Sequence, residues 1–325
     1  MSTTTLTPRE ETFPEMLQRL SAASVEHHFD AFADIKWDDP RFAVVPDDER
    51  WILPKEFPIG RHPWYQGLSR ERQIEIGMGY QAQMCKVGLQ FESILMRGVL
   101  QWVGRLDNND PQYRYLMHEV TEECHHTQMF QELVNRINVG SKGAPRWFRF
   151  LDPIVPLAGN LLPELFFTGI LAGEEPIDHI QKAVLRGGAE MHPLMVRIMQ
   201  IHVAEEARHI SFAHEWLRQY VPTLPKWRKA LLMFTYPATM RILGDVIVKP
   251  TKEFCAQYDI PKDVVDDIYW DSEAGQKMLR DLFADVRTLA QELGLINRVS
   301  RLWWKKLGID GRPARYRSEP APMAA

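Results

Sequence analysis

The stretch IHVAEEARHISF, residues 201–212, places His202, Glu206 and His209 four and three residues apart. In an α-helix this spacing puts the three residues on consecutive turns of one face. The other positions of that face are apolar: Met199, Ile210 and Ala213. The face is therefore expected to be buried, where a carboxylate is very costly unless a partner offsets its lost hydration. A metal ion is such a partner, so the three residues are candidate ligands.

A second stretch, EVTEECHHTQMF at residues 119–130, offers another Glu-x-x-His pair, Glu123 with His126. The helical face that this pair occupies is otherwise apolar: Leu116, Val120, Phe130 and Leu133. The neighbouring pair, Glu122 with His125, lies on a more polar strip of the same helix. Glu123 and His126 are therefore the candidates for a buried site.

Each motif is preceded by a further glutamate on an apolar helix face, Glu92 before Glu123 and Glu174 before Glu206. Turn-forming residues at 106–111 and 186–193 lie about midway within each pair. At about 1.5 Å per residue, the two arms of each hairpin are each about 20 Å long. The two carboxylates of each pair therefore lie at the same level along the helix axes. Two hairpins that each supply a Glu and a Glu-x-x-His match the ligand set of a di-iron or di-manganese helical bundle.

The chain reads as all-α, a four-helix bundle with additional N- and C-terminal helices, because apolar residues recur at spacings of three and four. The predicted helices are 70–106, 111–138, 160–187, 193–220, 225–250 and 261–294. Residues 31–69 are rich in proline and tryptophan and should wrap the core. We expect a single domain over residues 13–311, with flexible ends at 1–12 and 312–325.

Composition excludes several other classes of protein. The chain has 325 residues, 45 % hydrophobic and 25 % charged, with a formal net charge of −4, so no basic footprint indicates nucleic-acid binding. Its three cysteines form no C-x-x-C pair and are typical of reduced thiols. The N-terminus lacks the pattern of a signal peptide, and the expected location is cytoplasmic.

Two apolar runs resemble membrane spans. Residues 154–173 contain Asn160, Glu164 and two prolines, so a buried bundle helix explains this run better. Residues 229–249 could pack on the bundle, contact a membrane or meet a twin subunit. Packing on the bundle is the favoured interpretation, and we also expect a homodimer, since such bundles often bury apolar faces between two copies.

Glu122 and Glu205 each precede a candidate ligand by one residue. Either could accept the outer N–H of a coordinating histidine on the other hairpin, which would fix the orientation of the imidazole. Surface ion pairs, such as Glu205 with Arg208, are the competing interpretation. Glu175 and His179 form another pair four residues apart, at the edge of the site or on the surface.

At these residues the sequence resembles the AurF-type p-aminobenzoate N-oxygenases, non-haem di-iron enzymes with a ferritin-like fold. The family pattern is a Glu, then Glu-x-x-His, then a Glu, then His-x-x-x-Glu-x-x-His. The matching stretches are QFESIL, EECHHT, AGEEPI and IHVAEEARH, which carry Glu92, Glu123, His126, Glu174, His202, Glu206 and His209. His202 is the additional histidine that separates this pattern from six-ligand bundles. His125 departs from the family, where an apolar residue is expected.

The resemblance implies two iron ions, with manganese possible at one site, O₂ as co-substrate and an external electron donor. It implies oxygen transfer to the nitrogen of an arylamine through a diferric-peroxo oxidant. Two alternatives remain. A hydroxylase or desaturase could take a lipid-like acyl substrate in a tunnel lined by residues 161–171 and 230–234. A ferroxidase or iron-storage protein would instead need acidic channels.

Overall fold

The computed structural model describes residues 11–188 and 190–314, and this part of the chain is helical, without a β-strand. The predicted all-α class is therefore confirmed. The predicted flexible ends, 1–12 and 312–325, lie almost entirely outside the described residues.

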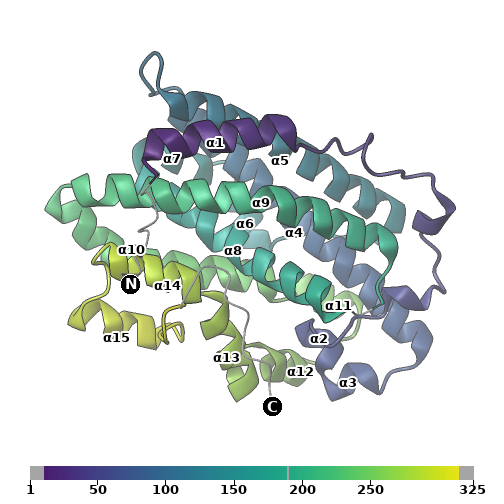
Figure 1. The fold of residues 1–325 in the computed structure, drawn as a ribbon. Helices are drawn as coiled ribbons and strands as arrows, with labels where there is room; N and C mark the ends of the chain where they lie inside the picture. Colours follow the sequence, from purple (N-terminus) through teal and green to yellow (C-terminus); the bar gives the residue numbers. More distant parts are fainter. Residues whose placement is uncertain (1–10, 189, 315–325) are drawn as a thin grey trace, which may run out of the picture.

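Four long helices form the bundle that carries the site (Figure 1). They are α4 (Arg70–Val103), α5 (Pro111–Ile137), α8 (Pro163–Gly187) and α9 (Pro193–Tyr220). Helix α4 packs along α5, and α8 packs along α9, so each predicted hairpin forms. Contacts between α5 and α9 and between α4 and α8 join the two hairpins into the ferritin-like bundle that the sequence predicts.

Local capping fixes the hairpin turns where the sequence places them. The Asp110 side chain accepts a hydrogen bond from the Gln112 N–H at the start of α5, and the His192 side chain accepts one from Leu194 N–H at the start of α9. Asn138 and Gly188 end α5 and α8 in the left-handed conformation, with φ of 52° and 63°. Asp110, His192 and Gly188 lie in the two hairpin turns and fix where the arms begin or end there, whereas Asn138 closes the far end of α5.

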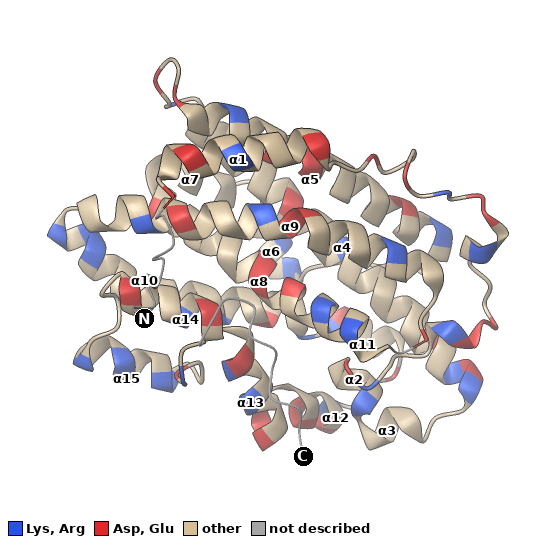
Figure 2. Cartoon of the chain, viewed as in Figure 1, with Lys and Arg blue, Asp and Glu red and all other residues tan. Residues whose placement is uncertain are grey.

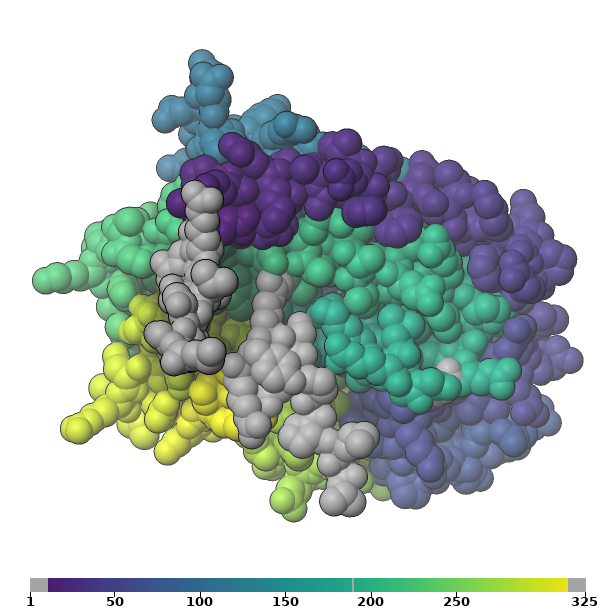
Figure 3. Space-filling model, viewed as in Figure 1, coloured from purple at the N-terminus to yellow at the C-terminus, as the bar shows by residue number. Residues whose placement is uncertain are grey.

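The N-terminal part wraps the bundle as predicted. Helix α1 (Phe13–Glu26) packs on α5 and α9. Four short helical turns follow: η1 (Pro40–Phe42), η2 (Glu49–Trp51), α2 (Pro58–Arg61) and α3 (Pro63–Gln66). Trp37 and Trp51 are buried by this wrap, and Trp51 stacks on His192 with ring centroids 4.1 Å apart. In Figure 3 the N-terminal segment, in purple, lies along one edge of the molecule beside α9.

The connection between the hairpins is irregular. It contains α6 (Arg146–Leu151), η3 (Val155–Leu157) and α7 (Ala158–Leu161). The predicted helix 160–187 therefore begins late, at Pro163, because Leu162 adopts a non-helical conformation (φ −139°, ψ 64°). The apolar run at 154–173 is therefore a buried bundle helix only from Pro163 onward, because Ile154, Leu157 and Leu161 lie in the irregular connection and are exposed.

The predicted helix 261–294 is wrong as a single element. It is divided into α12 (Lys262–Asp266), a π-helical turn η5 (Asp267–Asp271), α13 (Glu273–Leu282) and α14 (Ala284–Glu292). Trp270 has a φ of 73°, and Ser272 caps a new helix by accepting from Gly275 N–H. Helices α11 (Lys252–Gln257) and α15 (Arg298–Lys306) complete the C-terminal part.

Helix α10 (Lys226–Val248) carries the second apolar run and packs along α8, as favoured above. By length and composition alone, the segment Lys226–Gln257 could cross a membrane, and 44 % of its most apolar stretch is buried in the structure. Its outer side leaves Leu231, Phe234 and Ile242 exposed. One face of α10 is thus bundle core, and the other remains apolar and uncovered in the described chain.

Charged residues are interspersed over the helices rather than gathered by sign (Figure 2). One buried pair joins α10 to α8, where Arg228 Nη2 lies 2.6 Å from Glu164 Oε2. The mixture of signs agrees with the small net charge of the chain.

Candidate metal centre

The structure brings all seven candidate ligands together in two groups. The first group is Glu92, His126, His202 and Glu206. The second is Glu123, Glu174, Glu206 and His209. Within each group the potential ligand atoms all lie within 4.8 Å of one another, and Glu206 belongs to both. A pair of adjacent four-donor sites with one common carboxylate suits two metal ions.

Each of the four bundle helices supplies part of the centre, and every one of these side chains is buried. Helix α4 contributes Glu92 and α8 contributes Glu174, which are each 5 % exposed. The other five come from α5 and α9 and are at most 2 % exposed. The equal arms of the hairpins therefore do place the paired carboxylates at one height.

In the first group, His202 Nε2 lies 3.4 Å from Glu92 Oε1 and 3.3 Å from Glu206 Oε1. His126 Nδ1 lies 3.4 Å from Glu206 Oε1 and 3.0 Å from Glu123 Oε2. In the second group, His209 Nδ1 lies 2.8 Å from Glu123 Oε1 and 3.5 Å from Glu206 Oε2. One nitrogen of every imidazole thus faces the carboxylate oxygens.

The other nitrogen of each imidazole is hydrogen-bonded away from the centre. His126 Nε2–H donates to Glu205 Oε2 at 2.8 Å, and His209 Nε2–H donates to Glu122 Oε2 at 2.8 Å. These bonds cross between the hairpins, in the arrangement considered from the sequence. His202 Nδ1–H donates to Gln181 Oε1 at 3.0 Å. A neutral imidazole held in this way presents a lone pair to the centre, as a metal ligand must.

Arg208 links the two outer carboxylates. Its Nη2 lies 2.9 Å from Glu122 Oε1 and 3.6 Å from Glu205 Oε1. The backbone N–H of Phe29, in the N-terminal segment that wraps the bundle, also donates to Glu205 Oε1, at 3.1 Å. Because Glu205 is fully buried, the alternative of a surface ion pair between Glu205 and Arg208 is wrong, although the two residues do interact.

Four carboxylate oxygens of the centre have no hydrogen-bond partner among the described residues. They are both oxygens of Glu174 and both oxygens of Glu206, and the latter meet imidazole nitrogens only at 3.3 to 3.5 Å. Buried acceptors without donors are rare in folded proteins, since each costs its full desolvation energy. The orphaned atoms are all lone-pair donors that point to one place, so the residues present fit a pair of cations.

In metal-free protein, the pKa values of the buried groups would favour protons at the centre. Burial raises the pKa of Glu92 and of Glu174 well above the ordinary value, and neighbouring carboxylates raise it further. Burial would lower the pKa of His126 and of His209, but the adjacent carboxylates outweigh it, so both pKa values lie well above normal. In metal-free protein, protons would thus take the place of metal charge at the centre.

Metal binding should therefore release protons, because carboxylates and imidazoles coordinate in their deprotonated forms. Since the pKa values of Glu92, Glu174, His126 and His209 are raised, these groups hold their protons to higher pH than free carboxyls and imidazoles do, and metal affinity should rise with pH. Addition of Mn²⁺ to metal-free protein in weak buffer, followed by a pH indicator, measures the release. Binding without proton release, or affinity independent of pH between 6 and 8, would contradict this assignment.

The crossed hydrogen bonds predict separable effects at the two sites. Glu205→Gln removes the charge behind His126 and should weaken metal binding in the first group about 10- to 100-fold. Glu122→Gln should do the same through His209 in the second group. Metal titrations of the two variants, compared with the unaltered chain, provide matched controls for each other. Equal weakening of both sites in both variants would show that the outer carboxylates do not act through their own histidines.

Sequence reasoning missed two residues near the centre. Gln181 follows Glu174 by seven residues on the same face of α8, a signal that could have found it. Glu119 precedes Glu123 by one turn and is 1 % exposed, and its burial raises its pKa to about 8.

Other polar residues considered from the sequence lie away from the two groups. Glu175 is buried and hydrogen-bonded to His214, and His179 Nε2 lies 3.3 Å from Asp285 Oδ2, so this pair is not on the surface. His125 faces the wrap and accepts a hydrogen bond from Ala31 N–H at 3.3 Å.

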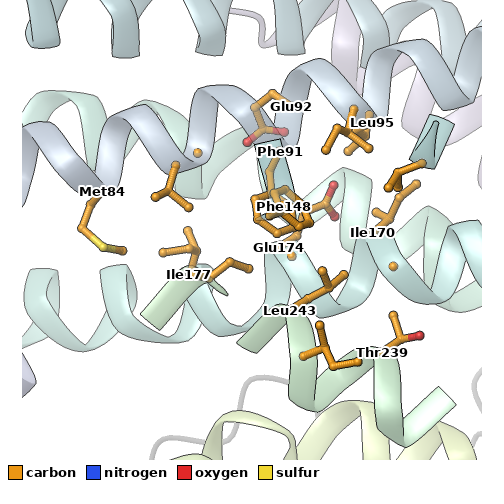
Figure 4. A pocket seen from close by; sticks show the side chains of 18 of the residues that line it. Met84, Phe91, Glu92, Leu95, Phe148, Ile170, Glu174, Ile177, Thr239 and Leu243 are labelled. Atoms are coloured by element: carbon orange, nitrogen blue, oxygen red, sulfur yellow. The ribbon is translucent and has the colours of Figure 1, made fainter. Parts of the chain in front are cut away.

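A cavity of about 600 Å³ leads to one side of the centre. Glu92 and His202 of the first group and Glu174 of the second line it. In Figure 4 the carboxylates of Glu92, from α4, and Glu174, from α8, extend into this cavity among apolar side chains. Part of the predicted segment 161–171 lines it, namely Leu161, Leu162, Leu165, Phe166, Gly169 and Ile170. The other predicted segment, 230–234, does not: helix α10 contributes Thr239, Ile242, Leu243 and Ile247 instead.

A helical bundle with buried, paired Glu/His clusters is the class of protein that holds a di-metal carboxylate centre. Comparison with known families agrees with this class. The chain matches the p-aminobenzoate N-oxygenase AurF family over residues 10–294, and it belongs to that family.

Close relatives come from mycobacteria. An uncharacterized protein of Mycobacterium bovis and one of Mycobacterium tuberculosis are each 53 % identical to the chain over 308 residues. The matched region covers 95 % of this chain and 91 % of each relative, so the similarity extends well beyond the ligand motifs.

Proposed function

We propose that the protein is an O₂-dependent non-haem di-iron oxygenase that transfers oxygen to the nitrogen of an amine. One observation carries the proposal: two four-donor groups share Glu206 and open on one side to a cavity large enough for a substrate. Membership in the AurF family supports an oxygenase and supports the amine as the reacting group.

The donor set suits iron or manganese. Four carboxylates balance the charge of two divalent ions, and three imidazoles complete a mixed nitrogen and oxygen set without thiolates. Glu92, Glu123, His126, Glu174, His202, Glu206 and His209 would hold the metals. Two bound iron ions would supply the redox chemistry that activates O₂.

The protein's own residues divide the centre into a closed and an open side. Glu122, Glu205 and Arg208 fix the imidazoles of His126 and His209 on the closed side, where the wrap covers them. Glu92, Glu174 and His202 face the cavity, whose mostly apolar lining would admit a substrate to this side of the centre. The first oxygenation converts R–NH₂, O₂, two electrons and two protons into R–NHOH and H₂O, so an external electron donor is part of the proposal.

The most direct test starts from metal-free protein reconstituted with ferrous iron under anaerobic conditions. About two iron ions per chain are expected by elemental analysis. Addition of ¹⁸O₂, a reductant and a panel of arylamines should then give products labelled on nitrogen. Absence of bound transition metal after careful reconstitution would overturn the proposal.

His202 offers a narrower test because it is the additional nitrogen donor. His202→Ala should reduce metal content from about two ions per chain to about one, or abolish the N-oxygenated product, since His202 Nε2 faces both Glu92 and Glu206. Gln181→Ala, which removes only the outer partner of His202, should weaken binding about 10- to 100-fold without losing the ligand. Unchanged metal content and product yield in His202→Ala would refute the assigned role.

A second candidate is hydroxylation or desaturation of a lipid-like substrate, and the apolar lining of the cavity favours it. The same experiment with fatty acyl substrates separates the two, because the label would then be found on carbon or in water. A ferroxidase is less well supported, because the cavity that reaches the centre is apolar and would repel a hydrated ferrous ion.

A further inference from the structure

In the described chain, the cavity next to the centre lacks a cationic side chain that could neutralise an anionic substrate. Among the described residues that line it, none is lysine or arginine. Its ionisable side chains near the centre are Glu92, Glu174 and His202, two of them acidic. A carboxylate bound here would lose its hydration without gaining a cationic side chain, because the four ligand carboxylates already balance the charge of two divalent ions.

The cavity is also far larger than a one-ring acid requires. Its volume of about 600 Å³ falls in the range of pockets that enclose drug-sized ligands. Aromatic and aliphatic side chains surround the part next to Glu92 and Glu174, among them Phe91 and Phe148. A small polar molecule would leave most of this apolar surface without contacts.

The apolar lining continues to the molecular surface. Several residues both line the cavity and are exposed to solvent: Trp147, Leu151, Ile154, Leu157, Leu161 and Ile242. Leu161 is 68 % exposed and Ile154 is 59 % exposed, although both are large hydrophobic residues. A ligand that fills the cavity would therefore meet apolar contacts from the centre to the entrance.

From these observations we infer that the substrate is an uncharged amine on a long apolar body, such as an alkyl-substituted arylamine, and that free carboxylates such as p-aminobenzoate are excluded. The amine would reach Glu92, Glu174 and His202, and the apolar body would extend toward the exposed rim. An arylamine is neutral at pH 7, so its nitrogen needs no counter-ion there. The identity of the reacting group rests on the proposed function, whereas the apolar body rests on the cavity itself.

Binding can be tested without turnover, in protein loaded with redox-inert Zn²⁺. Calorimetry should show that the butyl ester of p-aminobenzoate binds at least tenfold more tightly than p-aminobenzoate itself. In a series of 4-alkylanilines from ethyl to octyl, each added methylene should tighten binding about fourfold. Equal affinity for acid and ester, or affinity independent of chain length, would overturn the inference.

Gly169 of α8 provides a way to block the cavity. A Cβ built there meets only Leu243 Cδ1, at 3.9 Å, so a larger side chain can enter the open space. Gly169→Phe should weaken octylaniline binding at least tenfold while leaving the metal content and the affinity for ethylaniline unchanged. Gly169→Ala is the matched control and should bind octylaniline normally. Thr239→Phe, which enters from α10, tests the same space if Gly169→Phe does not fold. Unchanged octylaniline affinity in a folded blocking variant would also overturn the inference.

Turnover separates this inference from the proposed function. Tight, length-dependent binding of alkylanilines without any N-oxygenated product in the iron-loaded protein would leave the inference standing and remove the amine oxygenase. Efficient oxygenation of p-aminobenzoate, with its butyl ester inert, would overturn the inference about the substrate and leave the amine oxygenase standing.

Discussion

Replacing Glu206 with glutamine is expected to leave the chain with less than one bound metal ion and with no oxygenase activity. Glu206 is the one residue common to both four-donor groups, and both of its oxygens lack hydrogen-bond partners in the described chain. The substitution keeps the size of the side chain but removes one of four negative charges and half of its oxygen donors. Loss of one shared ligand therefore weakens both sites together, whereas loss of Glu92 or Glu174 should affect mainly one.

Elemental analysis after ferrous reconstitution and oxygen consumption with a reductant measure this effect. Glu164→Gln is the matched control, because Glu164 is also a buried glutamate of α8 but pairs with Arg228. It precedes Glu174 by ten residues, about 15 Å along the helix. The control should retain both metal ions. If Glu206→Gln also retained two ions with unchanged affinity, the shared-carboxylate arrangement would be wrong.

Removal of metal is expected to destabilise the fold strongly. A cation that binds only the folded chain contributes about 4 kcal/mol per site when its free concentration is about a thousand times Kd. For a chain of this size, two sites correspond to a fall in Tm on the order of 10 °C. The physical reason is the set of carboxylate oxygens of Glu174 and Glu206 without hydrogen-bond partners, which in metal-free protein are compensated only by protons on Glu174 and on the neighbouring imidazoles.

Thermal unfolding of reconstituted and chelated protein, measured by circular dichroism at one protein concentration, checks this prediction. The chelated Glu206→Gln variant is the control, because chelation should change its Tm little. Identical Tm values for metal-loaded and metal-free forms of the unaltered chain would show that the buried acids are satisfied in some other way.

The bundle was predictable from sequence because its hairpins are regular. Equal arms between the turn residues and the glutamates fix the heights of Glu92 and Glu123 in one hairpin, and of Glu174 and Glu206 in the other. Helical periodicity then fixes which side of each helix is buried. Local spacing therefore sufficed to bring the seven side chains to one place, since long regular helices carry positional information over many residues.

Other features depend on contacts that spacing does not encode. The helix breaks at Trp270, which has a φ of 73°. Because this position is neither glycine nor proline, the sequence gives no sign of the break, and the predicted helix 261–294 ran across it. The packing of α10 on α8 decides which residues of α10 line the cavity. The prediction named residues 230–234, but the lining residues begin at Thr239. The hydrogen bond from Phe29 N–H to Glu205 joins residues 176 positions apart and leaves no local trace.

That last bond has a consequence for how the protein is made. Chains grow from the N-terminus at about 5 to 20 residues per second, so Glu205 emerges on the order of ten seconds or more after Phe29. During that interval the proline- and tryptophan-rich segment has no α9 to cover, and the first group lacks His202 and Glu206. The complete centre can therefore take up two metal ions only after α9 has emerged and the N-terminal segment has closed over Glu205.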